Sequence, residues 1–345
     1  MGLKRKIEDI ILSRSNSYQF YKREYEKNSK DNKNSDNDVE KDFEKLKKQF
    51  DSFKTNTDRY MDSSTYLLRT LLVDYELNEP KDILKNIQKL SNELLIFCTN
   101  VCNECGISWW LDSSNLLGAA RHGNFIPWDD EVDIGMMRKD YIEFKKVINS
   151  KIEEYQLDDI LTVDYYEGNN TKSFVQILIK GNTLIDDDVV FTLLNIIPYD
   201  FLTEYDKKTF KKNYKKSYKK YLKNMQNNGD AQTCLKEYLD ELNISLDQTG
   251  FMIPSIDGKY SKNNKIFVLK TERMFPLNKI KFGENTYFAP NDVKYYLKKM
   301  YGDYLTLPRI VSIHDKIDAF RYNTNNDELF GELITRLTDV NSRFK

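Results

Sequence analysis

The sequence predicts an α+β fold in which helices flank a mixed sheet. Apolar residues recur with a helical period over residues 82–105, and this segment leads directly into a short strand at 109–112. Three runs with strand character then follow one another at 162–166, 174–179 and 189–197. Helical patterns return from residue 205 onwards. Because the strands cluster between groups of helices and do not alternate strictly with them, the pattern favours the α+β class.

The composition is that of a globular protein with a real core. Of 345 residues, 40% are hydrophobic and 31% are charged, and the formal net charge is −1. Such a balance argues against a protein that coats nucleic acid. No apolar run reaches the length that spans a bilayer and no secretory leader is evident, so we expect a cytoplasmic protein. The four cysteines suit reduced thiols.

Residues 1–60 are predicted to form an N-terminal helical arm that contains a disordered linker. Residues 1–27 mix basic and apolar side chains, which suits a helix docked on the body, on a partner or on the inner membrane surface. Residues 28–38 contain no apolar residue and form the linker. Residues 39–53 then carry apolar side chains at alternating spacings of four and three. This heptad pattern predicts a helix that packs on the body or forms a homodimer.

The long helix at 82–105 carries a cysteine pattern that needs an explanation. Cys98, Cys102 and Cys105 have the spacing of an iron–sulfur motif. They follow the apolar face of the helix, where a cysteine behaves as a small hydrophobic residue. We therefore expect three buried thiols without a metal, and Gly106 as the end of the helix.

The stretch from Trp109 to Met136 is the centre of the chain. It contains five acidic residues, four of them within residues 129–133 at the start of an apolar alternation. On a strand, Glu131 and Asp133 point to one face, and two adjacent carboxylates repel unless a cation lies between them. Oxygen ligands at this spacing suit Mg²⁺ or Mn²⁺. The alternative is a solvated acidic turn after Pro127.

A strand that feeds a helix through small residues precedes this acidic run. Residues 109–112 form the strand, and Ser113 or Ser114 is expected to cap a helix over 115–120. Such a helix N-terminus is a favourable phosphate-binding site. Further along, the strand that ends near residue 200 would bring Asn195 and Asp200 close to the acidic run if the sheet is contiguous.

The segment at 205–225 is predicted to be an amphipathic helix with nine lysines on its outer face. That face is either simply solvated or contacts an anionic lipid or polymer. Later in the chain, a turn at 283–285 joins two strands, Asn291 is expected to cap a helix over 293–301, and residues 323–345 are expected to be a polar tail with a short last helix.

The residues from Asp112 to Met136 resemble the core signature of the LicD/fukutin family of phosphotransferases. The sequence is D-S-S-N-L-L-G-A-A-R-H-G-N-F-I-P-W-D-D-E-V-D-I-G-M. Two further blocks are similar to that family, L-N-I-I-P-Y-D at 194–200 and Y-G-D-Y at 301–304 with His314 after it. The resemblance covers about residues 82–316, within a domain expected at 61–322.

The resemblance implies a polymerase-β-like nucleotidyltransferase palm. It further implies transfer of a phospho-substituent, such as phosphocholine or a phospho-alditol, from a CDP-activated donor to a hydroxyl of a cell-surface glycan or glycolipid, with Mg²⁺ or Mn²⁺. The implied catalytic residues are Asp129, Asp130, Glu131, Asp133 and Asp200. The implied donor- and phosphate-binding residues are Ser113, Ser114, Asn115, Arg121 and His122. The implied metal ligands are Glu131, Asp133 and Asn195.

Three positions depart from the family pattern. Ser113-Ser114 replaces a Gly-Gly turn, Glu131 replaces an aspartate, and Asn195 replaces the aspartate of the second block. The third change matters most, because an amide cannot accept a proton from the acceptor hydroxyl. Either another acid such as Asp200 takes that role, or turnover is slow, or the protein is a degenerate family member that acts as a nucleotide-binding or oligomeric scaffold.

Overall fold

The computed structural model describes residues 48–49, 52, 83–165, 175–181, 189–227, 230–254, 256, 267–306 and 326–344. The chain divides into a unit formed by residues 1–69 and 309–311, and a second unit formed by 70–308 and 312–345. All elements below belong to the second unit. Apart from helical positions at 48–49 and 52, the predictions for the N-terminal arm, its linker and its heptad lie outside the described residues, as does His314.

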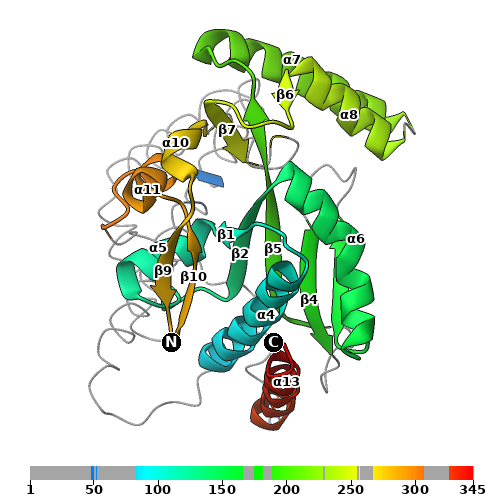
Figure 1. Ribbon diagram of the computed structural model, residues 1–345, viewed down its shortest axis with the longest axis vertical. Coiled ribbons are helices and arrows are strands. Elements are labelled where there is room, and N and C mark those ends of the chain that lie inside the picture. Colours follow the sequence, from blue (N-terminus) through cyan, green and yellow to red (C-terminus); the bar gives the residue numbers. More distant parts are fainter. Residues whose placement is uncertain are drawn as a thin grey trace, which may run out of the picture. The chain divides into compact units, whose positions relative to one another are not determined.

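The centre of the second unit is a mixed sheet, as the α+β prediction requires (Figure 1). Its main strands run in the order β1, β2, β5, β4, β3, and β2 and β5 are parallel while the other pairs are antiparallel. The bounds are β1 Trp110–Leu111, β2 Glu131–Met137, β3 Leu161–Tyr165, β4 Val175–Gly181 and β5 Val189–Leu202. Strands β6 (Ile244–Ser245) and β7 (Phe251–Pro254) pair with the carboxyl end of β5, and β8 (Leu269–Lys270) pairs with β7.

Helices α4 (Ile83–Glu104) and α6 (Arg138–Glu154) both contact strands β2 and β5. Successive β5 side chains point to opposite faces of the sheet. Thr192 is hydrogen-bonded to Ser91 of α4, and Asp200 is paired with Arg138 of α6. The even-numbered side chains of β5 therefore face these two helices, and the odd-numbered ones, including Asn195 and Tyr199, lie on the opposite face.

The last helix, α13 (Asn326–Asn341), lies beside α4 (Figure 1). Its buried residues are Phe330, Leu333, Leu337 and Val340. Phe330 meets Phe191 of β5 edge to face, with ring centroids 5.5 Å apart. The segment that the sequence suggested to be a polar tail thus contains a 16-residue helix with an apolar face, since its apolar residues recur every three or four positions.

Helix α5 (Ser113–His122) packs closely against the backbone of the segment that follows it. A Cβ atom on Gly118 would lie 2.5 Å from the carbonyl oxygen of Asn124, so only glycine fits there. The hairpin of β9 (Asn278–Phe282) and β10 (Asn285–Ala289) closes the other side, where the Gly283 amide donates to the carbonyl oxygen of Gly123 at 2.8 Å. This hairpin confirms the turn predicted at 283–285.

Helices α7 (Lys207–Gln226) and α8 (Ala231–Glu241) pack on each other beyond the end of β5. The remaining helices are α10 (Thr271–Met274) and α11 (Val293–Tyr301), and α11 contacts α5. Among the helices that the structure describes, none is both long and apolar enough to cross a bilayer.

Three local predictions are wrong. The helix after β1 is capped by Asp112, not by Ser113 or Ser114, because the Asp112 carboxylate accepts the Ser113 amide hydrogen. Likewise Asp292, not Asn291, caps α11 through the Tyr295 amide. Cys105 is exposed, since α4 ends at Glu104 and the chain turns at Gly106, whereas Cys98 and Cys102 are buried as expected.

Gly135 of β2 leaves room for the buried indole of Trp110, and this close contact gives a testable prediction. A Cβ atom at residue 135 would lie 2.5 Å from the ring. We expect Gly135→Ala to lower the free energy of unfolding by about 1–3 kcal/mol, because a fully buried ring cannot move aside. The measurement is urea unfolding. Gly331→Ala in α13 is the matched control, since open space surrounds that position; equal stability of both variants would contradict the packing described.

Candidate functional site

A row of polar side chains crosses four strands on the sheet face opposite α4 and α6. In the register of the parallel pair, Asp133 of β2 lies beside Asn195 of β5, and Asn195 lies beside Gln176 of β4. The Asn195 amide nitrogen donates to Oδ1 of Asp133 at 2.7 Å, and its oxygen accepts from Gln176 at 2.5 Å. Buried polar groups linked in this way hold each other in one orientation. The row therefore fixes the Asp133 carboxylate.

Asp112 extends this row on the other side of Asp133. It follows β1 directly, and its amide donates to the carbonyl oxygen of Asp133 at 3.0 Å. Its Oδ1 accepts from the hydroxyls of Tyr199 (3.0 Å) and Tyr296 and from the Ser113 amide (2.8 Å). Its Oδ2 is buried and has no hydrogen-bond partner among the described residues. Two buried carboxylates thus sit on neighbouring strands.

The first turn of α5 is fastened to the strand that carries Asp133. Oδ1 of Asn115 accepts the Asp133 amide hydrogen at 2.6 Å, and Nδ2 of Asn115 donates to the carbonyl oxygen of Glu131 at 3.4 Å. The half-buried Ser114 donates its hydroxyl to Oδ2 of Asp133 at 3.3 Å. Of the residues predicted to bind phosphate, Ser113, Ser114 and Asn115 therefore lie near the carboxylates of Asp112 and Asp133. Both polar atoms of the Asn115 side chain are hydrogen-bonded to the backbone of β2.

Ser113, which replaces the first glycine of the family's Gly-Gly turn, has an unusual backbone conformation. Its φ is 44°, in the left-handed region that favours glycine. A serine tolerates this conformation at a cost of about 1–2 kcal/mol, which the surrounding contacts must offset. Its amide is held by Asp112 and lies 3.4 Å from the Tyr296 hydroxyl. Ser113 therefore has a backbone conformation that a glycine would adopt without strain.

The acidic run 129–133 divides between the two faces of the sheet. Glu131 is half-buried and lies on the Asp133 face, and Asp129 and Glu131 both raise the pKa of Asp133 by repulsion. Asp130 is buried, and its carbonyl oxygen accepts from Thr192, which faces α4. The carbonyl oxygen of Asp129 accepts from Gln88 of α4 at 2.8 Å. The site face therefore receives Glu131 and Asp133, while Asp130 is turned towards the helix side.

Asp200 is not brought to the carboxylates. It occupies an even position of β5, and its two oxygens accept from Nε and Nη2 of Arg138 at 2.9 and 2.5 Å. Both side chains are buried, so this is a two-pronged ion pair that ties β5 to the first residue of α6. The sequence suggestion that Asp200 replaces the missing base receives no support from this position.

Arg121 and His122 lie at the far end of α5, eight and nine residues beyond Ser113. At about 1.5 Å per residue, this separates them from the first turn by roughly 12 Å along the helix. The Arg121 guanidinium donates to His122 and to the carbonyl oxygen of Tyr304, and stacks over Trp128 with 5.8 Å to the ring centre. Burial lowers the pKa of His122, with a further contribution from Arg121.

The pKa values of the two buried carboxylates, Asp112 and Asp133, are raised. Burial is the main cause and raises the pKa of Asp112 to about 7 and that of Asp133 to about 8. For Asp133, the hydrogen bond from Asn195 acts in the opposite direction, while Asp129, Glu131 and Asp112 add repulsion. A shift of this kind at a cluster of like charges marks a candidate functional site.

Four members of this site were missed in the sequence. Asp112 could have been found, because it follows a short strand by the same alternation that places Glu131 and Asp133 together. Gln176, Tyr199 and Tyr296 gave no local signal, since each reaches the site through strand register or through a helix nearly 200 residues away. Only the three-dimensional arrangement reveals them.

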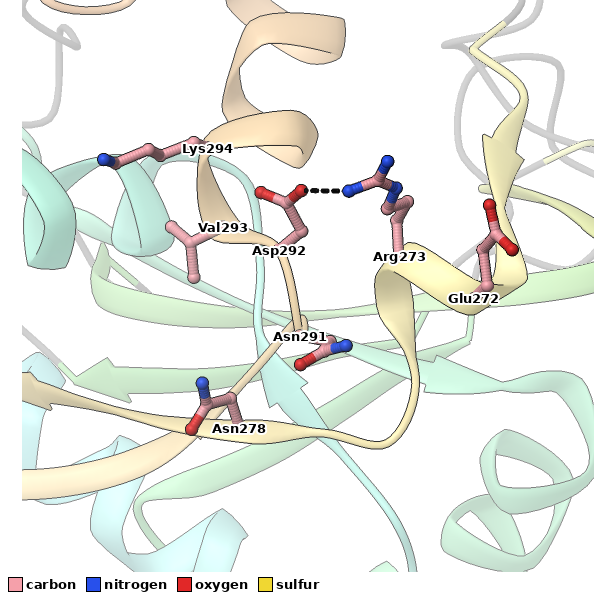
Figure 2. A pocket seen from close by; sticks show the side chains of 7 residues that line it. All are labelled: Glu272, Arg273, Asn278, Asn291, Asp292, Val293 and Lys294. Carbon is pink, nitrogen blue, oxygen red and sulfur yellow. Dashed lines mark hydrogen bonds and ion pairs between the residues drawn. The ribbon is translucent and has the colours of Figure 1, made fainter.

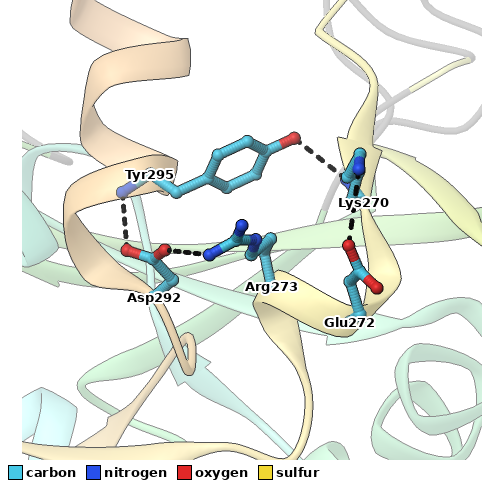
Figure 3. Close-up of polar contacts among 5 residues, drawn as sticks. All are labelled: Lys270, Glu272, Arg273, Asp292 and Tyr295. Carbon is cyan, nitrogen blue, oxygen red and sulfur yellow. Dashed lines mark hydrogen bonds and ion pairs between the residues drawn. The ribbon is translucent and has the colours of Figure 1, made fainter.

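A separate polar pocket of about 720 Å³ lies between α10, β9 and α11 (Figure 2). Its charged residues are Glu272, Arg273, Asp292 and Lys294, and Asn278, Asn291 and Val293 complete the lining. Figure 3 shows that the charges are largely paired, since Arg273 donates to Asp292 at 3.0 Å and Lys270 contacts Glu272. Val293 is one helical turn from Tyr296, so the pocket adjoins the site but contains none of the predicted site residues.

Comparison with known proteins places this arrangement in a family. Residues 106–227 match the model of the LicD/FKTN/FKRP nucleotidyltransferase domain. The segment belongs to the LicD family. It contains β1, α5, β2, β4 and β5, and hence every residue of the polar row.

Several curated proteins are similar to parts of the chain. The lipopolysaccharide cholinephosphotransferase LicD of Haemophilus influenzae is 35% identical over 95 residues, which are 26% of this chain and 35% of that protein. The ribitol 5-phosphate transferase FKRP of Homo sapiens is 46% identical over 44 residues, 13% of this chain and 9% of FKRP. An uncharacterized protein of Rickettsia typhi is 37% identical over 75 residues, 21% of this chain and 22% of that protein. The similarity thus spans at most about a third of each of these relatives.

The raised pKa values in the LicD-family segment make stability depend on pH. Native Asp112 and Asp133 bind protons more tightly than the unfolded chain, so their protonation stabilises the fold at low pH. That contribution is lost as pH rises towards their native pKa values of about 7 and about 8. In the presence of a chelator, we expect the free energy of unfolding to fall between about pH 5 and about pH 8, by up to ~1.4 kcal/mol per pH unit for each group.

Chemical denaturation at several pH values measures this dependence. Asp133→Asn should flatten the curve, whereas Asp159→Asn, at an exposed pair with Arg336, should leave it unchanged in this range. Exposed acids with lowered pKa values, such as Asp206 and Asp230, complete their ionisation below this window. Stability that stays constant or rises with pH would contradict the assignment.

Proposed function

We propose that this protein transfers a phospho-substituent, phosphocholine or a phospho-alditol, from a CDP-activated donor to a hydroxyl of a glycan or glycolipid, with a divalent metal ion. The observation that carries the proposal is the buried pair Asp112 and Asp133 beside the first turn of α5, in a segment that belongs to the LicD family. The names of the LicD and FKRP relatives, a cholinephosphotransferase and a ribitol 5-phosphate transferase, support this class of reaction. We further propose that the sheet is a nucleotidyltransferase palm.

The residues present fit a divalent cation. Asp112 and Asp133 are adjacent, buried and of like charge, and Oδ2 of Asp112 has no hydrogen-bond partner among the described residues. A cation between them would remove the repulsion and compensate for the lost hydration. Among the described residues, no group of three or more His, Cys, Asp or Glu side chains is arranged to hold a metal. This suits Mg²⁺, which commonly uses one or two carboxylates and completes its shell with water and substrate phosphate.

We assign the ion to the two buried carboxylates Asp112 and Asp133, and the half-buried Glu131 lies on the same face of β2 as Asp133. When bound, Mg²⁺ or Mn²⁺ would neutralise charge on the donor pyrophosphate. Asn195, which the sequence suggested as a ligand, would instead orient Asp133, because its amide nitrogen already donates to Oδ1 of that carboxylate and its oxygen accepts from Gln176. An amide at this position also avoids a third buried carboxylate.

The first turn of α5 is suited to the donor phosphates. The dipole of a helix favours negative charge at its N-terminus. The Ser114 hydroxyl, which lies against Asp133, is a polar group at this end of α5. In the reaction, the acceptor oxygen would bond to the phosphorus that carries the substituent, and the bond from that phosphorus to CMP would break. The acceptor proton would pass to Asp129 or Glu131, the half-buried carboxylates of the cluster.

Release of CMP tests the proposal. We expect Asp133→Ala to lower metal-dependent CMP release from a CDP-linked donor by more than about a hundredfold, since loss of residues around a metal site commonly costs ten- to a hundredfold even without loss of a ligand. Circular dichroism should show that the variant is folded. Asp159→Asn, on the exposed surface, should retain wild-type activity.

Equal CMP release by the Asp133→Ala variant and the wild type would contradict the assignment. Absence of turnover with every CDP-linked donor, in folded wild-type protein that contains Mg²⁺, would favour the alternative of a degenerate scaffold. The observation that favours this alternative is Asn195, which stands where the family has an aspartate.

A further inference from the structure

Helix α7 carries a strongly basic outer face that the proposed reaction does not use. All nine lysines between residues 207 and 223 are exposed, and the helix contains neither an arginine nor an acidic residue. The lysines occur as Lys-Lys pairs at every fourth position and end with Lys223. At about 1.5 Å per residue, they extend over roughly 24 Å. We call these nine residues the lysine face.

The opposite side of α7 is a fixed aromatic core. Phe210, Tyr214, Tyr218 and Tyr221 are buried against α8. Tyr214 and Tyr218 stack with ring centroids 5.7 Å apart, and Tyr221 stacks on Tyr238 of α8 at 4.9 Å. The Tyr238 hydroxyl donates to the carbonyl oxygen of Ile256 at 3.0 Å. Because this packing fixes the rotation of α7, the lysine face is held outwards.

The charges of the lysine face are little neutralised within the described part of the chain. Lys220 pairs with Glu241, and no other ion pair is found there for these lysines. Like charges four residues apart destabilise a helix by about 0.2–0.5 kcal/mol per pair. Lys207 and Lys208 also lie at the positive end of the helix dipole, where acidic residues are favoured. The arrangement is thus unfavourable for the isolated helix, and an anionic partner would relieve it.

The composition of the lysine face distinguishes among anionic partners. Nucleic acids are bound by arginine and by exposed aromatic rings that stack on bases, but α7 has no arginine and turns its buried aromatic rings inwards. Single-stranded nucleic acids are commonly bound in basic grooves, whereas the lysine face is the convex outside of a helix. A convex row of compact ammonium groups fits a planar anionic surface. The polar residues among the lysines, such as Thr209 and Asn213, leave no apolar group to insert.

We propose that the lysine face of α7 docks this protein on the surface of an anionic lipid bilayer, by electrostatic contact with headgroups and without insertion. Each lysine near such a surface contributes about 1 kcal/mol, so several acting together give stable but reversible binding. The chain as a whole has a net charge of −1, so binding depends on this local concentration of charge. The proposal is independent of the transferase activity.

Sedimentation of the full-length protein with vesicles tests the proposal. We expect binding to phosphatidylcholine vesicles that contain about 30% phosphatidylglycerol, and none to pure phosphatidylcholine. Raising the salt from about 50 mM to about 500 mM should release the protein, because screening shortens the range of the attraction. The combined variant Lys208→Gln, Lys212→Gln, Lys215→Gln and Lys219→Gln should bind at least ~10-fold more weakly.

A matched variant with four exposed lysines exchanged elsewhere controls for total charge. It carries Lys89→Gln, Lys139→Gln, Lys281→Gln and Lys298→Gln and should bind as the wild type does. Thermal melts verify folding, and the smaller variant Lys212→Gln and Lys216→Gln serves if the fourfold α7 variant is not folded. Equal binding to neutral vesicles, no vesicle binding, or unchanged binding of the α7 variants would each overturn the proposal. Retention on a soluble polyanion without vesicle binding would assign the face to a polymer.

Discussion

The hydrogen bond from Asn195 to Asp133 is the interaction on which the rest of the site depends. It exists because β2 and β5 are parallel neighbours in the one register that sets these two residues side by side. A shift by one residue would turn Asp133 towards α4 and α6 and expose an apolar side chain in its place. The antiparallel register of β1 and β2 adds to this arrangement, since it places Gly135 beside the indole of Trp110. Tyr199 of β5 lies on the same face as Asn195 and donates its hydroxyl to Asp112.

The carboxylates are enclosed by groups from the whole length of the domain. Asn115 holds the backbone of β2 from the first turn of α5, while Tyr296 reaches Asp112 from α11. On the opposite face, the buried pair of Arg138 and Asp200 fixes β5 against α6. Breaking this pair would leave an uncompensated buried charge, which generally costs several kcal/mol. Asp200 therefore supports the strand that carries Asn195, at a distance from the chemistry.

Much of the fold could be predicted because its signals are local. The helical period before Gly106, the apolar alternation after Glu131 and the turn at Gly283 each identify an element directly from a few residues. The cap of α5 was assigned to the wrong residue because Asp112, Ser113 and Ser114 can all cap a helix. Only the position of the Asp112 carboxylate, which accepts the Ser113 amide hydrogen, decides among them. The packing of α13 on α4 depends on contacts between the chain's distant parts.

In the candidate site, too, some positions follow from local sequence patterns and others depend on contacts between distant parts of the chain. Glu131 and Asp133 follow from strand alternation alone, but the position of Asp200 does not, because it depends on which side of β5 faces α6. Arg121 and His122 belong to the same motif in sequence, yet a helix of ten residues separates them from the carboxylates. Proximity in sequence predicts proximity in space only within one turn of a helix or on one face of a strand.

The most direct test of the central claim, that Asp112 and Asp133 form a metal-dependent donor site, is a thermal melt with CDP-choline, CDP-glycerol and CDP-ribitol. Each compound would be added with and without Mg²⁺ to the wild type and to Asp133→Ala. A ligand that binds only the native state raises its stability as the ligand concentration exceeds Kd. The account predicts an increase in Tm with one donor that requires Mg²⁺ and is lost in the variant. An increase that persists in Asp133→Ala, or no increase with any donor, would contradict it.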